Sequence, residues 1–417
     1  MTLSLQKEHF SKLKFILGLL ILLVYIPDNA IGSQLSIKGS SQIEYRMYES
    51  DNNSQTQDEN LLFINKIQSD YKKGNQQFRS RLWFQQDSIN KASTTFAVEE
   101  LYLSYQQQDY DLFMGAKVIN WSTLEVFHPT NFINSRNYDS SLISPVKIGE
   151  PMIGATYYFS TLNLNFFYMP YIINPIFADV TNRLRAASLP VASPRYFDKS
   201  SIEITQSQLF QYALKSDFTY KNTDVNLFFS DHMDRLQPLI TLDNGALVPN
   251  YFRLRQVGFS SESAFKDILV KFEYTYKDFI GSYGSLKQKD HSHFATGTEY
   301  TYIHRSGLAS TFIAEYSIIP DLSKQSRSTL GILQNDITFL YNLSFNNEAS
   351  TLAQVLVLKD LDVDSEYLML FKLSQRFFNR LIGSVGVQWI TSKSSTSSGL
   401  KNLEDADYTY VSITNYF

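Results

Sequence analysis

The chain ends with Asp407 to Phe417, DYTYVSITNYF, a stretch in which apolar and polar side chains alternate. Successive side chains of a β-strand point to opposite faces, so Val411, Ile413 and Phe417 share one face of an extended chain. Asn415 interrupts that apolar face. The stretch therefore predicts an aromatic β-strand at the end of the chain.

The other end of the chain has the composition of a secretory leader. A positive region with Lys7, Lys12 and Lys14 precedes an apolar core over residues 15–26, and a small-x-small cleavage signal occupies residues 30–32. The apolar core is too short for a helix that spans a bilayer, which needs about 20 residues. We therefore expect residues 1–32 to be a cleaved signal peptide and residues 33–417 to be the mature protein.

Beyond the leader, the composition is typical of an all-β protein. No second apolar run is long enough to cross a membrane as a helix, and the chain contains 27 Tyr and 31 Phe. Short alternating segments are separated by Asn, Asp, Gly and Ser, which indicates many strands and turns. A helical membrane protein is thus excluded, whereas a soluble β-sandwich and a transmembrane β-barrel both fit.

The alternation is clearest in the segment from Ile268 to Lys277. One face carries Ile268, Val270, Phe272, Tyr274 and Tyr276, and the other carries Lys271, Glu273, Thr275 and Lys277. The same division recurs in residues 78–85, 367–376 and 381–389. A barrel strand has lipid on one face and a polar lumen on the other. The leader and the terminal strand favour this interpretation over a sandwich.

The spacing of turns and loops also indicates a barrel, because outer-membrane barrels have short turns on one side and longer loops on the other. Tight turns are predicted at residues 72–74, 107–109, 160–161, 221–223, 261–263, 304–307, 346–347 and 378–379. Long connections are predicted at residues 50–59, 120–149, 173–204, 235–250, 281–289, 320–328 and 392–403, with shorter ones on the same side near 88–91 and 359–364. The predicted fold is all-β: a single transmembrane antiparallel β-barrel over residues 33–417, with about eighteen strands, sixteen being the next best count, and short periplasmic turns.

The terminal strand resembles the C-terminal signature of Gram-negative outer-membrane β-barrels, in which a final aromatic residue is read by the assembly machinery. Phe417 is the matching residue and thus the candidate assembly signal. The resemblance implies a location in the bacterial outer membrane. It also implies outer-membrane lipid, lipopolysaccharide and the barrel assembly machinery as partners.

A second resemblance lies between Glu100 and Arg136. This segment resembles an uncharacterised family of porin-like barrels with a G-[KR]-[QK]-x-x-x-W-G segment followed by an N-P-x-D-x-x-N loop. Gly115, Lys117, Trp121, Pro129 and Asn134 match the pattern, whereas Ala116, Ser122, His128 and Asn131 depart from it. The resemblance implies porin-like placement in the outer membrane and no particular substrate.

Charged residues on the polar faces of the strands are candidates for lining a pore: Arg79, Arg81, Glu100, Lys271, Glu273, Lys277, Lys372 and Arg376. Charged rings in a pore set its ion selectivity, and the excess of basic residues suggests a weak preference for anions. Interior charges are usually paired, however. Mutual pairing of these charges with Glu100 and loop carboxylates, which would cancel the preference, is the favoured alternative.

Two long loops are candidates for narrowing the pore. The first contains Trp121, Pro129, Asn134 and Arg136, and the second contains Arg183, Arg185 and Arg195. A loop of this length either folds into the lumen, as in porins, or packs on its neighbours outside the barrel. The three arginines of the second loop face either an anionic solute or lipopolysaccharide.

Composition and motifs exclude several other functions. The formal charge of −4 provides no basic surface for nucleic acid, and the absence of Cys excludes disulfides and thiolate metal sites. Five histidines follow the leader: His128, His232, His291, His293 and His304. Only His291 and His293 share a face of one strand, and two imidazoles without a third ligand make a weak metal site. We therefore expect no enzyme activity, no metal and no cofactor.

Three classes of function stay open. A porin-like channel for passive or solute-selective diffusion of small molecules explains the strand number, the long loops and the charged faces. A conduit for hydrophobic or lipid-like substrates requires a lateral gap or an apolar lumen, for which Gly383 and Gly386 in one strand are a hint. An adhesive or structural outer-membrane barrel requires little lumen. The solute, its charge and the oligomeric state, monomer or trimer, are not specified by the sequence.

Overall fold

The strands of the protein pair in chain order until the last one meets the first. The computed structural model describes residues 33–49, 56–185, 189–199, 202–207, 209–328, 330–331, 333–392 and 400–417. The expected signal peptide, residues 1–32, lies outside the described residues. Parts of the predicted connections 50–59, 173–204 and 392–403 also lie outside them.

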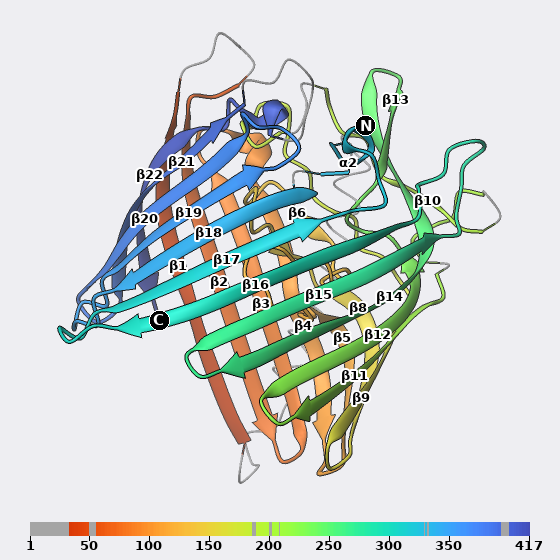
Figure 1. The fold of residues 1–417 in the computed structure, drawn as a ribbon, viewed down its shortest axis with the longest axis horizontal. Helices are drawn as coiled ribbons and strands as arrows, with labels where there is room; N and C mark the ends of the chain where they lie inside the picture. The colour runs from red at the N-terminus through yellow and green to blue at the C-terminus, as the bar shows by residue number, and fades with distance from the viewer. Residues whose placement is uncertain are drawn as a thin grey trace.

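Eighteen antiparallel strands form the closed sheet of the described residues (Figure 1), which confirms the higher of the two predicted strand counts. They are β1 (Ser33–Tyr48), β2 (Glu59–Lys73), β3 (Gln76–Asp87), β4 (Thr95–Gln106), β5 (Tyr110–Lys117), β8 (Glu150–Tyr158), β9 (Leu162–Met169), β11 (Gln211–Tyr220), β12 (Thr223–Met233), β14 (Ala246–Phe265), β15 (Ile268–Phe279), β16 (His291–Ile303), β17 (Ala309–Ile318), β18 (Asn335–Ser344), β19 (Leu352–Asp360), β20 (Tyr367–Phe377), β21 (Leu381–Thr391) and β22 (Tyr408–Tyr416).

The seam between β1 and β22 closes the barrel. Their register runs from Ser40 opposite Tyr416 to Tyr48 opposite Tyr408. Beyond it, the Gly39 N–H donates to the Phe417 carbonyl at 2.9 Å, and the Phe417 N–H donates to the Gly39 carbonyl at 3.1 Å. Closure removes the free sheet edges, so that the first and last strands also have a partner for their backbone groups.

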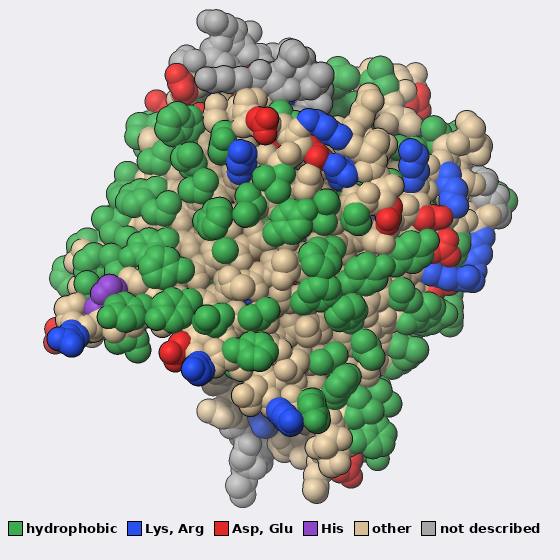
Figure 2. Space-filling view, viewed as in Figure 1, with side chains coloured by type: hydrophobic (Ala, Val, Ile, Leu, Met, Phe, Trp, Pro, Cys, Tyr) green, Lys and Arg blue, Asp and Glu red, His purple; other side chains and the backbone are tan. Residues whose placement is uncertain are grey.

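The two faces of each strand differ as the alternation predicted. On β15, Ile268 is 45% exposed on the outer face, whereas Glu273 on the inner face is fully buried. Hydrophobic side chains cover the middle of the outer face that Figure 2 shows, and charged side chains gather toward its rims. The outer face is therefore suited to lipid, and the inner face is largely polar.

Tight turns join the strands at one end of the barrel and longer connections join them at the other. Seven of the eight predicted tight turns fall between strands. The turn predicted at residues 261–263 was wrong, because β14 continues to Phe265 and the turn lies at Lys266, whose φ is 55°. Serine misled the prediction: Ser263 faces Thr223 across the sheet, and their hydroxyls lie 2.8 Å apart.

β14 extends past the barrel rim and carries a small sheet there. β13 (Leu239–Asp243) forms a hairpin with its first residues, and β10 (Arg195–Phe197) pairs parallel with residues 250–252. Figure 1 shows this hairpin projecting beyond the other strands. The predicted connection 235–250 is thus partly a β-hairpin.

The remaining elements are short. They are η1 (Lys91–Ser93), β6 (Arg136–Asn137), β7 (Val146–Lys147), α2 (Lys324–Ser328) and η2 (Lys401–Leu403). Among the described residues, no helix has the length and apolar character needed to cross a membrane.

Gly39 leaves no room for a side chain at the seam. A Cβ at this position would lie 2.4 Å from the Lys66 carbonyl oxygen and 2.7 Å from the Phe417 ring. We expect Gly39→Val to displace Phe417 and to lower the free energy of unfolding by about 1–3 kcal/mol, because overpacking at a fixed site costs that much. Urea unfolding of the protein refolded in lipid vesicles measures the change.

The matched control is Ser41→Val, two positions further on the same outer face. Ser41 is exposed, so we expect a change within about 0.5 kcal/mol. Equal destabilisation by the two substitutions would show that the seam has no special steric constraint.

Candidate functional site

The connection from β5 to β8, residues 118–149, lies inside the barrel, and we call it the inner loop. It forms two lobes: residues 118–134 are the first lobe and residues 135–148 are the second lobe. Backbone amides of the first lobe donate to Glu273 of β15 and Glu315 of β17, whose side chains are on the inner faces of strands distant from β5. These contacts place the inner loop in the lumen and not outside the barrel.

Glu273 binds the first lobe through both carboxylate oxygens. Its Oε1 accepts hydrogen bonds from the Thr123 N–H and the Ser122 hydroxyl, each at 2.6 Å. Its Oε2 accepts from the Thr130 hydroxyl at 2.8 Å and the Thr130 N–H at 3.2 Å. Because Glu273 is fully buried, these donors replace the water that the carboxylate loses. The two oxygens hold two separate parts of the lobe against one point of the wall.

Glu315 binds the tip of the first lobe in a similar way. Three successive amides donate to its carboxylate, those of Glu125 at 2.6 Å, Val126 at 3.0 Å and Phe127 at 3.2 Å. Successive backbone N–H groups that converge on one anion form a favourable binding arrangement. Sequence reasoning missed Glu315, because in the sequence it is one polar residue among several on the inner face of β17.

Aromatic packing fixes the beginning of the first lobe against the nearer wall. The Trp121 ring centroid lies 5.2 Å from that of Phe132 within the lobe. It also lies 5.7 Å from Phe167 of β9 and 5.4 Å from Phe228 of β12. These inner-face aromatic residues form an apolar seat for the lobe.

A second apolar seat receives the tip of the lobe. Leu124, Val126 and Phe127 are buried in a cluster with inner-face residues of β16 and β19 to β21. The wall residues in this cluster are Ala295, Leu356, Leu358, Leu368 and Ile390. The first lobe therefore spans the lumen between two apolar seats and two carboxylates.

The second lobe contacts the connection from β9 to β11. The Tyr138 N–H donates to the Ile176 carbonyl at 2.8 Å, and the Tyr138 ring stacks on Phe177 with centroids 5.6 Å apart. Asp139 accepts hydrogen bonds from Asn182 and from the Ser93 hydroxyl. Burial nevertheless raises the pKa of Asp139 to about 6. The two long connections are thus joined by polar contacts over the lumen.

A buried ion pair supports the return of the inner loop to the wall. Arg235 Nε lies 2.9 Å from Glu150 Oε1, and both side chains are fully buried. Glu150 also accepts from the Ser135 hydroxyl at 3.2 Å and the Ile173 N–H at 3.2 Å. No pattern in the sequence distinguished Arg235 or Glu150 from other charged residues, and both were missed.

Two of the predicted pore-lining arginines lie on β3 and are paired. Arg79 Nε lies 2.5 Å from Asp70, and Arg81 Nη2 lies 3.4 Å from Glu100. A register shift at Arg81 also brings Glu99 within 3.8 Å of its Nε. Of the predicted residues, the structure thus brings Arg81 and Glu100 together.

The predicted lysines of β15 are paired as well. Lys271 Nζ lies 3.1 Å from Glu299, 3.2 Å from Glu125 of the inner loop and 3.9 Å from Glu262. Lys277 Nζ donates to Gln237 Oε1 at 2.5 Å and lies 4.0 Å from Asp234.

Lys372 and Arg376 lie near the tight-turn end of β20, where both are exposed. The role of all eight wall residues in lining a pore stays a prediction.

The residues predicted for constriction fall into separate places. Trp121, Pro129, Asn134 and Arg136 belong to the inner loop. Asn134 closes its base, because its amide donates to the Lys117 and Ile148 carbonyls, each at 2.9 Å. Arg136 bridges the two lobes through the Asn131 carbonyl at 3.2 Å.

The three arginines of the second loop do not gather at one point. Arg183 forms an ion pair with Asp58, and Arg185 donates to the Asn182 carbonyl at 3.3 Å. Arg195 lies beyond the rim on β10, 2.6 Å from Asp243 of β13. Whether any of them meets a solute stays a prediction.

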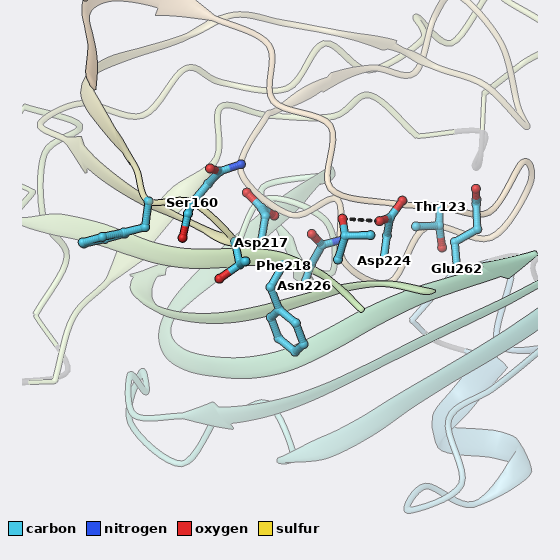
Figure 3. Close-up of a pocket in the computed structure, with 11 residues that line it drawn as sticks. Thr123, Ser160, Asp217, Phe218, Asp224, Asn226 and Glu262 are labelled. Carbon is cyan, nitrogen blue, oxygen red and sulfur yellow. Dashed lines mark hydrogen bonds between the residues drawn. The ribbon is translucent and has the colours of Figure 1, made fainter. Parts of the chain in front are cut away.

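A polar recess lies against the first lobe on the side of the tight turns. Its volume is about 520 Å³, and Thr123 of the inner loop faces it together with residues of β11, β12 and β14 (Figure 3). Asp217, Asp224, Asn226 and Glu262 supply polar groups to its lining. The lumen beside the inner loop therefore contains open, hydrophilic space.

The histidines contribute to structure through neutral partners. His291 Nε2 lies 3.2 Å from Gln237 Oε1, and His293 Nε2 lies 2.8 Å from the Ser317 hydroxyl. His128 Nδ1 lies 2.8 Å from the Ser122 hydroxyl, which also donates to Glu273 and so holds the first lobe. Within the described ranges, no group of three or more His, Asp or Glu residues is placed to hold a metal ion.

The glycines of β21 do not mark a lateral gap. β21 pairs with β20 from Leu381 to Thr391 and with β22 from Leu381 to Gln388 without a register shift. A Cβ on Gly383 would meet the Phe377 ring at 2.8 Å, and one on Gly386 would meet the Tyr410 ring at 2.4 Å. Aromatic rings cover both glycines, as is common in stable sheets.

Comparisons with known proteins give similarities of fold alone. No family model and no curated protein sequence matches the chain. Similar solved structures include two engineered variants of the porin from Rhodopseudomonas blastica, with sequence identities of 11% and 12% and TM-scores of 0.46 and 0.45. Each alignment covers 92% of this chain and 100% of the porin chain. The closed ladder from β1 to β22, and not these similarities, establishes the fold.

We expect Glu273→Gln to release the first lobe from the wall. The glutamine side chain would place an NH₂ group opposite the N–H and hydroxyl donors of the first lobe. We expect the free energy of unfolding to fall by about 3 kcal/mol, because hydrogen bonds to a buried charge are lost. Hydrogen exchange of residues 122–130 should become faster, and urea unfolding should report the loss of stability. Glu44→Gln, the same substitution at a buried carboxylate of β1 whose partner is Arg46, is the control and should leave exchange in this segment unchanged. Unchanged exchange in Glu273→Gln would contradict the anchoring role.

We expect Arg235→Leu to lower the free energy of unfolding by about 3–5 kcal/mol, because it leaves the carboxylate of Glu150 buried without its partner. Urea unfolding in lipid vesicles measures the loss. The control is Arg195→Leu, which breaks a partly exposed pair on the rim and should cost about 0–1 kcal/mol. Similar losses in both variants would contradict the supporting role of the buried pair.

Proposed function

We propose that the protein is a porin-like channel through which small polar solutes diffuse passively across a bacterial outer membrane. The observation that carries the proposal is the inner loop, which crosses the lumen and is fixed there by Glu273 and Glu315. The polar recess beside it, of about 520 Å³, supports a lumen that is narrowed and still hydrated. A largely polar inner wall suits hydrophilic solutes.

The other two classes of function have less support. A conduit for hydrophobic molecules would need an exit through the wall or an apolar path, and the pairing of β20, β21 and β22 is continuous. The apolar inner-face residues of β19 to β21 are covered by the first lobe. An adhesive or structural barrel has no need of a loop held inside its lumen by buried carboxylates.

The proposed location includes removal of the leader and assembly through Phe417. Expression in a Gram-negative host, followed by membrane fractionation and N-terminal sequencing, tests it. The mature protein should appear in the outer-membrane fraction with an N-terminus near Ser33. Retention of residues 1–32 in the folded protein, or recovery in the inner membrane, would contradict this part of the proposal.

Conductance in a planar bilayer tests the channel. We expect steady single-channel currents from the refolded mature protein. Replacing residues 138–145 with Asn-Gly should close the β6–β7 pair with a two-residue turn. Because this shortens the inner loop and removes Tyr138 and Asp139, which join it to the β9–β11 connection, we expect conductance to rise about twofold.

The control replaces residues 241–248 with Asn-Gly. It removes the same length of chain from the β13–β14 hairpin, which lies beyond the rim. Its conductance should equal that of the unmodified protein. A correctly folded barrel without current, or an equal rise in both variants, would contradict a channel narrowed by the inner loop.

A further inference from the structure

Two basic residues face each other in the second lobe. Arg136 of β6 and Lys147 of β7 are direct cross-strand partners, a position at which like charges repel. Arg136 Nη2 donates to the Asn131 carbonyl at 3.2 Å, and Lys147 Nζ donates to the Ile119 carbonyl at 3.4 Å and to the Asn120 side-chain oxygen. Both cations therefore reach from the second lobe to the first, and the acceptors they find there are neutral.

Neither cation has an anionic partner among the residues that the structure describes. No carboxylate of those residues lies within the 4.0 Å of an ion pair from Arg136 or Lys147. The Arg136 Nε is buried and has no hydrogen-bond acceptor. A buried donor without a partner is rare, because it loses its water and gains nothing. The pair thus lacks a counter-charge, and the Arg136 Nε also lacks an acceptor.

The pKa shifts of the inner loop agree with an uncompensated positive potential. Burial, followed by the charge of Arg136, lowers the pKa of Lys147 to about 7, and Glu273 opposes this shift only in part. Burial also lowers the pKa of Arg136. Burial, and then Arg136 and Lys147, lower the pKa of His128 to about 3, so its imidazole is neutral near pH 7.

We propose that Arg136 and Lys147 form a binding site for a small oxyanion, such as the carboxylate, sulfate or phosphate group of a solute. An oxyanion between them would accept hydrogen bonds from the Arg136 Nε–H and the Lys147 ammonium group. The oxyanion would thereby give the Arg136 Nε–H an acceptor and give both cations a negative partner. Hydrogen bonds between charged groups are stronger than those between neutral groups.

The inference rests on the proposed function, because the site belongs to the loop that narrows the proposed channel. It adds the class of solute, which is anionic. Wall cations are a weaker source of anion preference, because Arg79, Arg81 and Lys271 each have a carboxylate partner. Lys372 and Arg376 form no ion pair among the described residues, but both are exposed, and solvent and salt screen exposed charges. We therefore assign the selectivity for anions to the inner loop.

The test uses the full mature protein in a planar bilayer with a KCl gradient, and inorganic phosphate and acetate as probes. We expect a reversal potential that indicates chloride preference, and a reduction of the chloride current by at least one probe. In the double variant Arg136→Gln/Lys147→Gln, the preference for chloride should disappear. The probe concentration that halves the chloride current should rise about tenfold, which corresponds to the loss of about 1.4 kcal/mol of binding free energy. Stronger action of phosphate than of acetate assigns the site to phosphate groups, and the reverse assigns it to carboxylates.

The matched control is Arg255→Gln/Lys287→Gln. It removes one Arg and one Lys that are about half exposed, in strand β14 and in the β15–β16 connection. Its reversal potential and its response to the probes should equal those of the unmodified protein. An equal loss in both double variants, or no response of the unmodified channel to either probe, would overturn the anion site. If the double variant does not fold, the single variant Lys147→Gln replaces it in the same measurements.

Thermal unfolding of the same proteins in detergent separates the site from the channel. Either probe should raise the Tm of the unmodified protein and leave that of the Arg136→Gln/Lys147→Gln variant unchanged. Stabilisation without current would retain the anion site and overturn the proposed channel. Current without stabilisation, and without a change of selectivity in the variant, would retain the channel and overturn the site.

Discussion

Satisfaction of backbone hydrogen bonds within the closed sheet is the constraint on which the rest of this structure depends. A strand that crosses a bilayer has no water to bind its N–H and C=O groups, so its neighbours must bind all of them. The seam between β1 and β22 completes that requirement, since it gives the first and last strands a partner. Once the ladder is closed, every strand has one face toward the outside of the barrel and one toward the lumen, and the environment of each side chain follows from its position in the alternation.

The lumen created in this way is occupied by part of the chain. An amide-rich loop in a low-dielectric interior needs acceptors, and the inner face of the wall supplies two buried carboxylates, Glu273 and Glu315. The carboxylates in turn need donors, because a buried charge without partners is costly. Loop and wall therefore satisfy each other, and apolar seats around Trp121 and Phe127 exclude water from the contact. Because these hydrogen bonds satisfy both the loop amides and the wall carboxylates, the loop is a fixed part of the lumen.

Much of the fold could be predicted from the sequence, because it depends on local patterns. The alternation from Ile268 to Lys277 set the two faces of β15, and turn residues such as Gly74 and Asn346 have the positive φ that a tight turn needs. The turn predicted at residues 261–263 failed because serine is common both in turns and in paired strands, and only the partner strand distinguishes the two. The position of the inner loop could not be predicted in this way. The hydrogen bond from Ser122 to Glu273 joins residues 151 positions apart, and no local pattern encodes such a contact.

The same distinction applies to the charges of the candidate site. Some partners follow from register alone: Asp70 lies directly opposite Arg79, and Glu100 directly opposite Arg81, so a correct strand alignment already neutralises them. The partner Glu125 of Lys271 comes from the inner loop, and only the position of that loop in the lumen reveals it. A count of basic residues on the strands therefore overstates the positive potential of the wall. Arg136 and Lys147 of the inner loop, by contrast, contact only neutral acceptors among the described residues, so the contacts that hold the loop in the lumen leave these two charges uncompensated there.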